Sequence, residues 1–221
     1  MEIRKFRAQY NLELIPASHE GISLGNLVWD PILGPPDFSK KGMPNTIFNA
    51  FLDADLIKQS EWDQFKAEYQ NSPLIDAQLA TRTVDINIES VSELQHPTIG
   101  KISGGFTFDL IRKFTFSKLQ MREMTDLTRI RIDGFLEVMK ATRWKEYDGS
   151  IRRVFMITEL YYGTMRMVVE KQYSAELEAI LDKIELETIH RTEGSHAVEY
   201  EFSHQNVPFA MRIERVRSFN G

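Results

Sequence analysis

The stretch that decides the expected fold is residues 106–118, Phe-Thr-Phe-Asp-Leu-Ile-Arg-Lys-Phe-Thr-Phe-Ser-Lys. Its odd positions are mostly polar, and its even positions are Phe106, Phe108, Leu110, Arg112, Phe114, Phe116 and Lys118. This alternation predicts a long amphipathic β-strand, or two strands joined without a strong turn signal. A tilted strand needs only about 9 to 11 residues to cross a bilayer. The stretch is therefore long enough to cover a domain core or to enter a membrane.

A second β-rich stretch runs from Ile151 to Lys171. It contains the apolar runs Val154-Phe155-Met156-Ile157 and Met165-Arg166-Met167-Val168-Val169. The two stretches together supply the side chains that we consider as candidates for membrane insertion. These are Phe106, Phe108, Leu110, Phe114, Phe116, Phe155, Ile157, Met165, Met167 and Val169.

Helix signals occur between the strands. Asn45 is expected to cap a helix whose apolar face is Ile47, Phe48, Phe51 and Leu52. Ser60 and Asp63 form a start resembling a capping box for a second helix, which carries Trp62, Phe65 and Tyr69. Ser174 is expected to cap a third helix, with apolar residues Leu177, Ile180, Leu181 and Ile184.

Further strands are expected at 11–16 and at 84–88. Ile130 and Ile132 indicate another strand, followed by a short helix at 135–139. Residues 198–202 and 209–213 are expected to pair as a terminal hairpin. The sequence thus predicts an α+β fold, a twisted and mainly antiparallel sheet with flanking helices. We expect a single domain over 1–221, with a helical insert at about 35–71.

Composition limits the classes of protein that the chain can belong to. Its 221 residues are 42% hydrophobic and 27% charged, which is typical of a folded protein. It has no cysteine, which excludes disulfides, thiolate catalysis and S-acylation. No apolar run approaches the roughly eighteen residues of a transmembrane helix, and the N-terminus lacks the apolar core of a secretory signal. We therefore expect the chain to be made and stored in the cytoplasm.

The charge distribution is uneven although the net charge is only −5. Between Lys101 and Lys145 there are ten bases and five acids, and this basic stretch coincides with the amphipathic strand. Basic side chains attract anionic lipid headgroups, and we consider Arg112, Lys113 and Lys118 as candidate contacts. Nucleic acid is the weaker alternative because the whole chain is acidic and lacks an aromatic and basic recognition motif. A solvated face paired with acidic regions is equally consistent with the pattern.

Patterns of catalytic residues are missing from the sequence. The five histidines do not have a recognised metal-ligand spacing, and Ser18-His19-Glu20 places the residue types of a catalytic triad side by side. A triad is assembled from separate parts of a chain, so this run does not predict one. Gly100, Gly104 and Gly105 lack the context of a phosphate-binding loop and are expected to permit a bend. We expect no enzymatic activity, no catalytic or metal site and no cofactor.

Several short motifs, taken in order, resemble the gasdermin pore-forming family, in particular its short bacterial members. The similar segments are Tyr10–Pro16, Leu24–Leu27, Phe114–Phe116, Ile130–Leu136, Val154–Leu160, Glu199–Phe202 and Val207–Ile213. Val-Phe-Met-Ile-Thr-Glu-Leu at 154–160 looks like the family's apolar strand of the form VFVVTxVL. The insert from Pro35 to Asn71 has no counterpart that we can place, and the N-terminal cysteine that bacterial relatives commonly carry is absent.

The resemblance implies a function and a set of partners. It implies pore formation by oligomerised amphipathic β-hairpins, in cell death or antiphage defence, with strands from 78–121 and 151–202 entering the membrane. The implied partners are membrane lipids, further copies of the chain and an inhibitory or activating protein, and the active form would lie at the cell membrane. Because the chain ends soon after its last expected strand, we expect that activity needs no proteolytic cut. The alternative is a soluble protein-binding or immunity-type module without catalytic activity.

Overall fold

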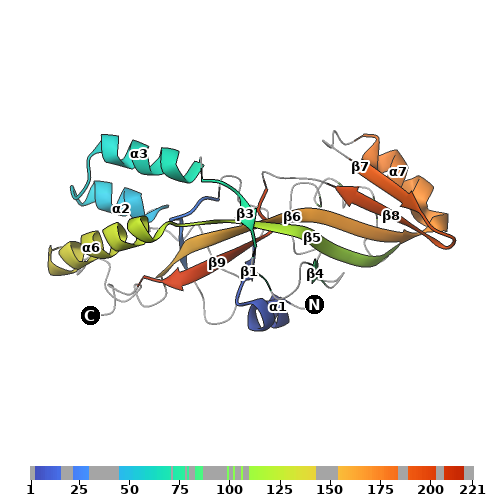
Figure 1. Cartoon of the computed structure of the whole chain (residues 1–221), viewed down its shortest axis with the longest axis horizontal. Coiled ribbons are helices and arrows are strands. Elements are labelled where there is room, and N and C mark those ends of the chain that lie inside the picture. Colours follow the sequence, from blue (N-terminus) through green and yellow to red (C-terminus); the bar gives the residue numbers. More distant parts are fainter. Residues whose placement is uncertain are drawn as a thin grey trace. The chain divides into compact units, whose positions relative to one another are not determined.

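The structure is a computed structural model that describes residues 3–15, 22–29, 45–70, 72–77, 79, 83–86, 99, 102, 106, 110–142, 154–183, 189–202 and 207–216. Its fold is mixed α+β, with a large, mainly antiparallel open sheet and several helices (Figure 1). The predicted fold class and the mainly antiparallel sheet are therefore confirmed.

Nine strands are assigned in the described part of the chain: β1 Glu13–Leu14, β2 Leu27–Trp29, β3 Ile75–Asp76, β4 Thr83–Asp85, β5 Ile111–Glu123, β6 Val154–Glu170, β7 Ile189–Glu193, β8 Ala197–Phe202 and β9 Ala210–Arg215. The sheet order is β1-β9-β6-β5-β3, with β2 and β8 also paired to β6, β4 to β5 and β7 to β8. The second β-rich stretch thus forms one strand of 17 residues, and this strand pairs with β2, β5, β8 and β9.

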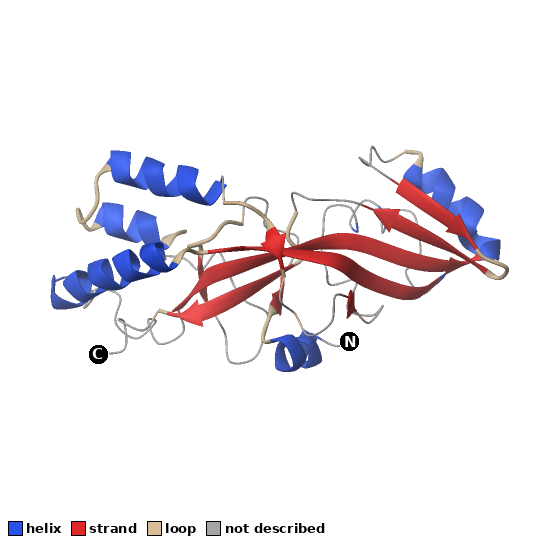
Figure 2. Cartoon of the chain, viewed as in Figure 1, coloured by secondary structure: helices blue, strands red, loops and turns tan. Residues whose placement is uncertain are grey.

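The three helices predicted after 45, 60 and 174 are present, whereas the helix at Ile3–Tyr10 was not predicted (Figure 2). They are α1 Ile3–Tyr10, α2 Ile47–Asp53, α3 Gln59–Gln70, α6 Asp126–Thr142 and α7 Ser174–Leu181, with the 3-10 turn η4 Lys171–Tyr173 before α7. The hydroxyl of Thr46, rather than the Asn45 side chain, accepts the Asn49 N–H and caps α2. The predicted start at Ser60 and Asp63 is wrong, because α3 begins at Gln59 and the Lys58 N–H donates to the Glu61 carboxylate, which is half of a capping box. The predicted cap at Ser174 is also wrong, because Ser174 is the first residue of α7 and Tyr173 is its N-cap.

The contacts within the chain define two compact units. Unit 1 comprises Met1–Glu20, Leu74–Met121 and Tyr161–Met211, and unit 2 comprises Gly21–Pro73, Arg122–Leu160 and Arg212–Gly221. The long strands β5 and β6 contribute residues to both units. The single domain over 1–221 and the insert at 35–71 remain predictions.

Each unit has its own packing. In unit 1, side chains from α1, α7 and the strands form one buried cluster that includes Phe6, Leu177, Phe116 and Phe209, and the rings of the last two stack with centroids 4.0 Å apart. In unit 2, α2, α3 and α6 pack through aromatic pairs, Phe48 on Phe65 and Phe51 on Phe135. A fully buried large apolar side chain contributes about 1.5–3 kcal/mol relative to an exposed one, so these clusters stabilise their units.

One predicted strand is wrong. Ile130 and Ile132 lie in the middle of α6, which begins after Thr125, whose hydroxyl accepts the Thr128 N–H at 3.3 Å. Two residues separated by one position share a face in a strand but point in nearly opposite directions in a helix. In agreement with a helix, Ile132 is buried and Ile130 is exposed. The alternation of these two residues was therefore not a strand signal.

The predicted terminal hairpin is also wrong, because β8 and β9 do not pair with each other in the described sheet. β8 pairs with the C-terminal half of β6, and β9 pairs with β1 and with β6. The Phe209 N–H donates to the Tyr161 carbonyl and the Val216 N–H to the Val154 carbonyl. The residue numbers run in opposite directions on the two strands, as in an antiparallel pair. Both segments are strands, but their partner is β6.

Candidate membrane-inserting strands

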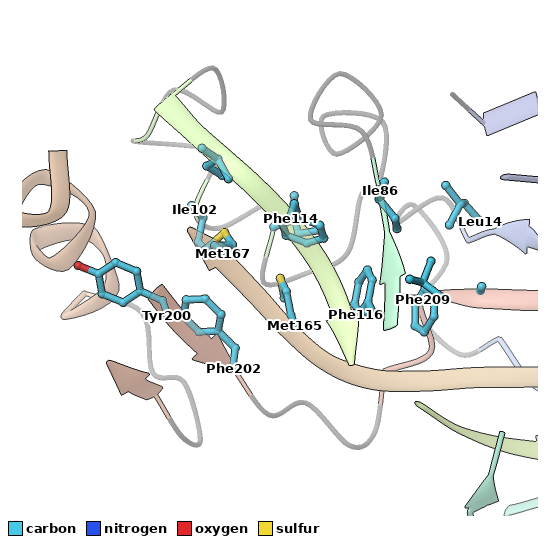
Figure 3. Packing of buried hydrophobic residues seen from close by; sticks show 14 of the residues in the cluster. Leu14, Ile86, Ile102, Phe114, Phe116, Met165, Met167, Tyr200, Phe202 and Phe209 are labelled. Atoms are coloured by element: carbon cyan, nitrogen blue, oxygen red, sulfur yellow. The ribbon is translucent and has the colours of Figure 1, made fainter. Parts of the chain in front are cut away.

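The C-terminal half of β6 and the whole of β8 form a strand pair with two different faces. Their antiparallel register places Met165 opposite Phe202, Met167 opposite Tyr200 and Val169 opposite Val198. All six side chains are buried. Figure 3 labels four of them, Met165, Met167, Tyr200 and Phe202, and shows them gathered with other side chains of the unit 1 core. We call these six residues, together with Phe114 and Phe116 of β5, the apolar face.

The strand β5 joins this face, but not with the expected alternation. Its core-facing residues are Ile111, Phe114, Phe116, Leu119 and Met121, so the phase of the alternation changes twice. Arg112 and Lys113 are both exposed at the first change. Lys118 has a backbone φ of 50° at the second, a left-handed conformation that occurs in β-bulges. The strict even-position face predicted over 106–118 is therefore wrong, and the strand begins at Ile111 rather than Phe106.

The opposite side of the same strands carries charged residues, and we call it the charged face: Arg112, Lys118, Arg166, Glu170, Glu199 and Glu201. Arg112 donates through two nitrogens to Glu170, at 2.8 and 3.0 Å. Arg166 contacts Glu199 at 2.9 Å and Glu201 at 3.2 Å. Charges of opposite sign on neighbouring strands stabilise the sheet and keep this face hydrated. The sheet of unit 1 is thus amphipathic across its thickness.

Glu201 lies where two cations meet. Its carboxylate accepts from Lys118 at 2.5 Å and from Arg166 at 3.2 Å, and only 15% of its side chain is exposed. The hydrogen bond from Lys118 is the largest of the influences that hold the pKa of Glu201 below its ordinary value, and Arg166 adds to it. The charged form of Glu201 is therefore favoured in the folded protein.

Helix α7 packs against the apolar face in unit 1. Leu177 and Leu181 are buried in the same cluster as Tyr200. The Tyr200 hydroxyl donates to Glu178 of α7 at 2.9 Å, and Glu178 also pairs with Arg191 of β7 at 2.8 Å. Burial and the neighbouring Glu178 carboxylate raise the pKa of Tyr200 to about 12. These polar contacts at the edge of α7 therefore hold the helix over the apolar face.

The other two candidate membrane-inserting residues of β6, Phe155 and Ile157, belong to unit 2. Ile157 is fully buried, and its N–H donates to the Asn26 carbonyl. Phe155 is half-buried, with the Arg215 guanidinium 5.7 Å from its ring centroid. Two positions after Ile157, the buried Glu159 accepts from Arg212 at 3.1 Å. An ionised pair on the same side of the strand interrupts the apolar row there.

The structure describes most of the other predicted site residues. Phe106 is buried and Leu110 is partly buried against the unit 1 core. The three candidate lipid contacts are exposed, and each faces an acid: Arg112 faces Glu170, Lys113 faces Asp85 at 3.8 Å and Lys118 faces Glu201. Phe108, the glycines at 100, 104 and 105, the run 18–20, Ile88 and Ile184 lie outside the described residues.

The region 151–202, which the resemblance implies enters the membrane, contains β8, but no residue of β8 is among the candidates predicted from the sequence. The signal was present, because Val198, Tyr200 and Phe202 alternate with Glu199 and Glu201. The sequence predicts a hairpin of 198–202 with 209–213, and not the pairing of this segment with Met165 and Met167. The ion pairs of the charged face depend on the register between strands, which a single sequence does not specify.

No family model matches the chain, and no curated protein matches it either. Within the described ranges, no helix has the length and apolar character needed to cross a membrane. In the same ranges, no three histidine, aspartate or glutamate side chains are grouped so that they could hold a metal ion.

Proposed function

We propose that this chain permeabilises membranes as a gasdermin-type pore-forming protein. The observation that carries the proposal is the two-faced pairing of β6 and β8. Over 165–170 and 197–202, buried apolar residues alternate with more exposed and mainly charged ones, in register on both strands. A strand pair that contacts lipid on one side and water on the other needs this pattern.

The strand lengths also support the proposal. The part of β6 in unit 1, from Tyr161 to Glu170, has about the 9 to 11 residues that a tilted strand needs to cross a bilayer. The part of β5 in the same unit, from Ile111 to Met121, is of similar length. The insertion that we propose uses these segments and β8, and it leaves the Glu159 pair outside the hydrocarbon. β8 has six residues in the stored fold, so the proposal requires it to lengthen at the membrane.

The proposed mechanism begins from the stored fold, in which α7 and the rest of the unit 1 core cover the apolar face. At a membrane, α7 leaves the strands, the apolar face contacts lipid and the charged face turns to water. An open sheet edge in hydrocarbon would leave backbone groups unsatisfied at several kcal/mol each. Each copy must therefore pair with neighbouring copies until the ring closes. The partners are membrane lipids and further copies of the chain, with storage in the cytoplasm.

The experiment is dye release from vesicles treated with the whole chain, followed by negative-stain imaging of the membranes. We expect release from anionic vesicles, rings of protein in the images, and no release after Phe116→Asp. Phe209→Asp is the matched control, because Phe209 stacks on Phe116 in the same core but lies outside the inserting strands. Both variants should lower the stability of the stored fold, and only the first should block release.

Two results would contradict the proposal. One is a folded wild-type chain that releases no dye from either anionic or neutral vesicles, with or without limited proteolysis. The other is a soluble Phe116→Asp variant that releases dye as fast as the wild type. In either case the soluble protein-binding module becomes the better account.

A further inference from the structure

Helix α6 of unit 2 presents apolar side chains to solvent. Of the four large hydrophobic residues that are exposed in the described part of the chain, three lie on this helix: Leu127, Ile130 and Val138, with exposed fractions of 59%, 67% and 49%. They are spaced by three and by eight residues, so they share one face of the helix. The opposite face is buried through Thr128, Ile132, Leu136 and Met139. The exposed row is therefore additional to the contact of α6 with its own unit.

Gly134 lies in the middle of this row. A Cβ added at Gly134 would have no atom within 4 Å, so the helix surface is open at this position. A glycine in a helix interior is less favourable than alanine. Between Ile130 and Val138, its missing side chain leaves a shallow gap into which a side chain of another helix fits. Small residues at such positions allow two helices to approach closely.

Acidic residues flank one side of the row. Asp126, Asp133 and Glu137 are exposed, and none of them has a salt bridge within the described residues. This contrasts with the charged face of unit 1, where each acid has a basic partner. The exposed base beside the row, Arg131, has its guanidinium 5.9 Å from the Phe65 ring centroid. The surface is thus apolar along its centre and negative along one edge.

We infer that this face of α6 is a docking surface for a basic amphipathic helix of a partner protein. The apolar side chains of the partner helix would cover Leu127, Ile130 and Val138. The lysine or arginine side chains of the partner helix would pair with Asp126, Asp133 and Glu137. Apolar contact provides most of the affinity in such helix pairs, and complementary charge selects the partner. A second copy of α6 fits less well in an antiparallel pair, because its acidic edge would meet the acidic edge of the first. Anionic lipid is disfavoured for the same reason.

The inference does not depend on membrane permeabilisation, and its test uses no lipid. The probe is a fluorescent helical peptide of about five turns, with leucine along one face and lysine beside it. A mirror peptide carries glutamate in place of every lysine. Fluorescence anisotropy with the whole chain, at physiological salt, should show saturable one-to-one binding of the lysine peptide and much weaker binding of the glutamate peptide.

Two variants locate the binding. Ile130→Asp should weaken binding of the lysine peptide at least about tenfold, and circular dichroism should be unchanged because Ile130 is exposed. Asp133→Lys with Glu137→Lys should weaken it by a similar factor and strengthen binding of the glutamate peptide. The matched control is Asp53→Lys with Asp63→Lys, which changes the net charge equally at exposed positions on α2 and α3 and should leave affinity within about twofold.

The docking surface is excluded if the wild-type chain does not bind the lysine peptide. It is also excluded if Ile130→Asp has no effect, or if the control pair weakens binding as much as the pair on α6. The last result would mean that the peptide responds only to the overall negative charge of the chain.

Discussion

Glu201 links two strands through a single carboxylate, since it accepts from Lys118 of β5 and Arg166 of β6. Glu201→Gln should lower the free energy of unfolding by about 1 kcal/mol at neutral pH, because both cations lose a charged partner. The pKa of Glu201 is lowered in the fold. The ionised Glu201 carboxylate therefore stabilises the fold fully at pH values above its pKa in the unfolded chain. This stabilisation is lost as the pH falls through the lower pKa that Glu201 has in the folded protein.

Urea unfolding at about pH 7 and about pH 3 measures this effect. The difference in unfolding free energy between wild type and Glu201→Gln should be present at the higher pH and should shrink at the lower one. A difference that is equal at both values would show that the carboxylate charge does not contribute.

Tyr200 connects the apolar face to α7 through its hydroxyl. Tyr200→Phe should lower the unfolding free energy by about 0.5–1.5 kcal/mol, with Glu178 still paired to Arg191. Because the fold raises the pKa of Tyr200 to about 12, its contribution is complete below the ordinary value of 10.0 and is lost as the pH rises through about 12. Melting temperatures measured from about pH 8 to about pH 11 should fall more steeply for the wild type. Parallel curves would contradict this account.

At the residue scale, the sequence predicted which side chains of β6 are apolar and alternate, and Met165, Met167 and Val169 are buried on one face. It left open that the basic stretch is paired with acidic regions, but it did not predict which acids Arg112 and Lys118 contact. Those pairs join residues that are distant in the sequence, and they form only when the strand register brings them together. The left-handed backbone at Lys118 could not be predicted either, because lysine has no preference for a positive φ.

At the element scale, α6 shows how a short apolar pattern misleads. The pair Ile130 and Ile132 is compatible with a strand, and only the longer spacing of Thr128, Ile132, Leu136 and Met139 indicates a helix. For the final strands, alternation predicted β8 and β9 correctly as strands, but sequence proximity suggested the wrong partner. Pairing between strands is not specified by their proximity in the sequence, and β6 pairs with both β8 and β9.

The helical assignment of α6 makes a prediction about two neighbouring isoleucines. Ile132→Ala should lower the unfolding free energy by about 2–5 kcal/mol because it leaves a cavity under the helix. Ile130→Ala should change it by no more than about 0.5 kcal/mol because Ile130 is exposed. Chemical denaturation of the two variants is the measurement. Similar losses from both would mean that the two side chains share a buried face, as they would in a strand.

At the scale of the whole molecule, the charges of β5 make a prediction about lipid selectivity. Changing Arg112, Lys113 and Lys118 together to glutamine should weaken binding to anionic vesicles by up to about 1 kcal/mol per residue and leave binding to neutral vesicles unchanged. The loss of binding free energy should be smaller than for basic side chains without an acidic partner, because each of the three faces an acid in the stored fold. Vesicle co-sedimentation over a series of salt concentrations measures it. Binding that is unchanged and insensitive to salt would show that these charges only stabilise the fold.

The central claim is that β6 turns its apolar face to lipid and its charged face to water. The chain has no cysteine, so a single cysteine can be placed at each position from Met165 to Glu170 and labelled with an environment-sensitive fluorophore. In vesicles, the account predicts that labels at 165, 167 and 169 are quenched by nitroxide-bearing lipid, whereas labels at 166, 168 and 170 are quenched by aqueous iodide. Quenching that does not alternate along the strand, or labels that do not respond to vesicles, would contradict it.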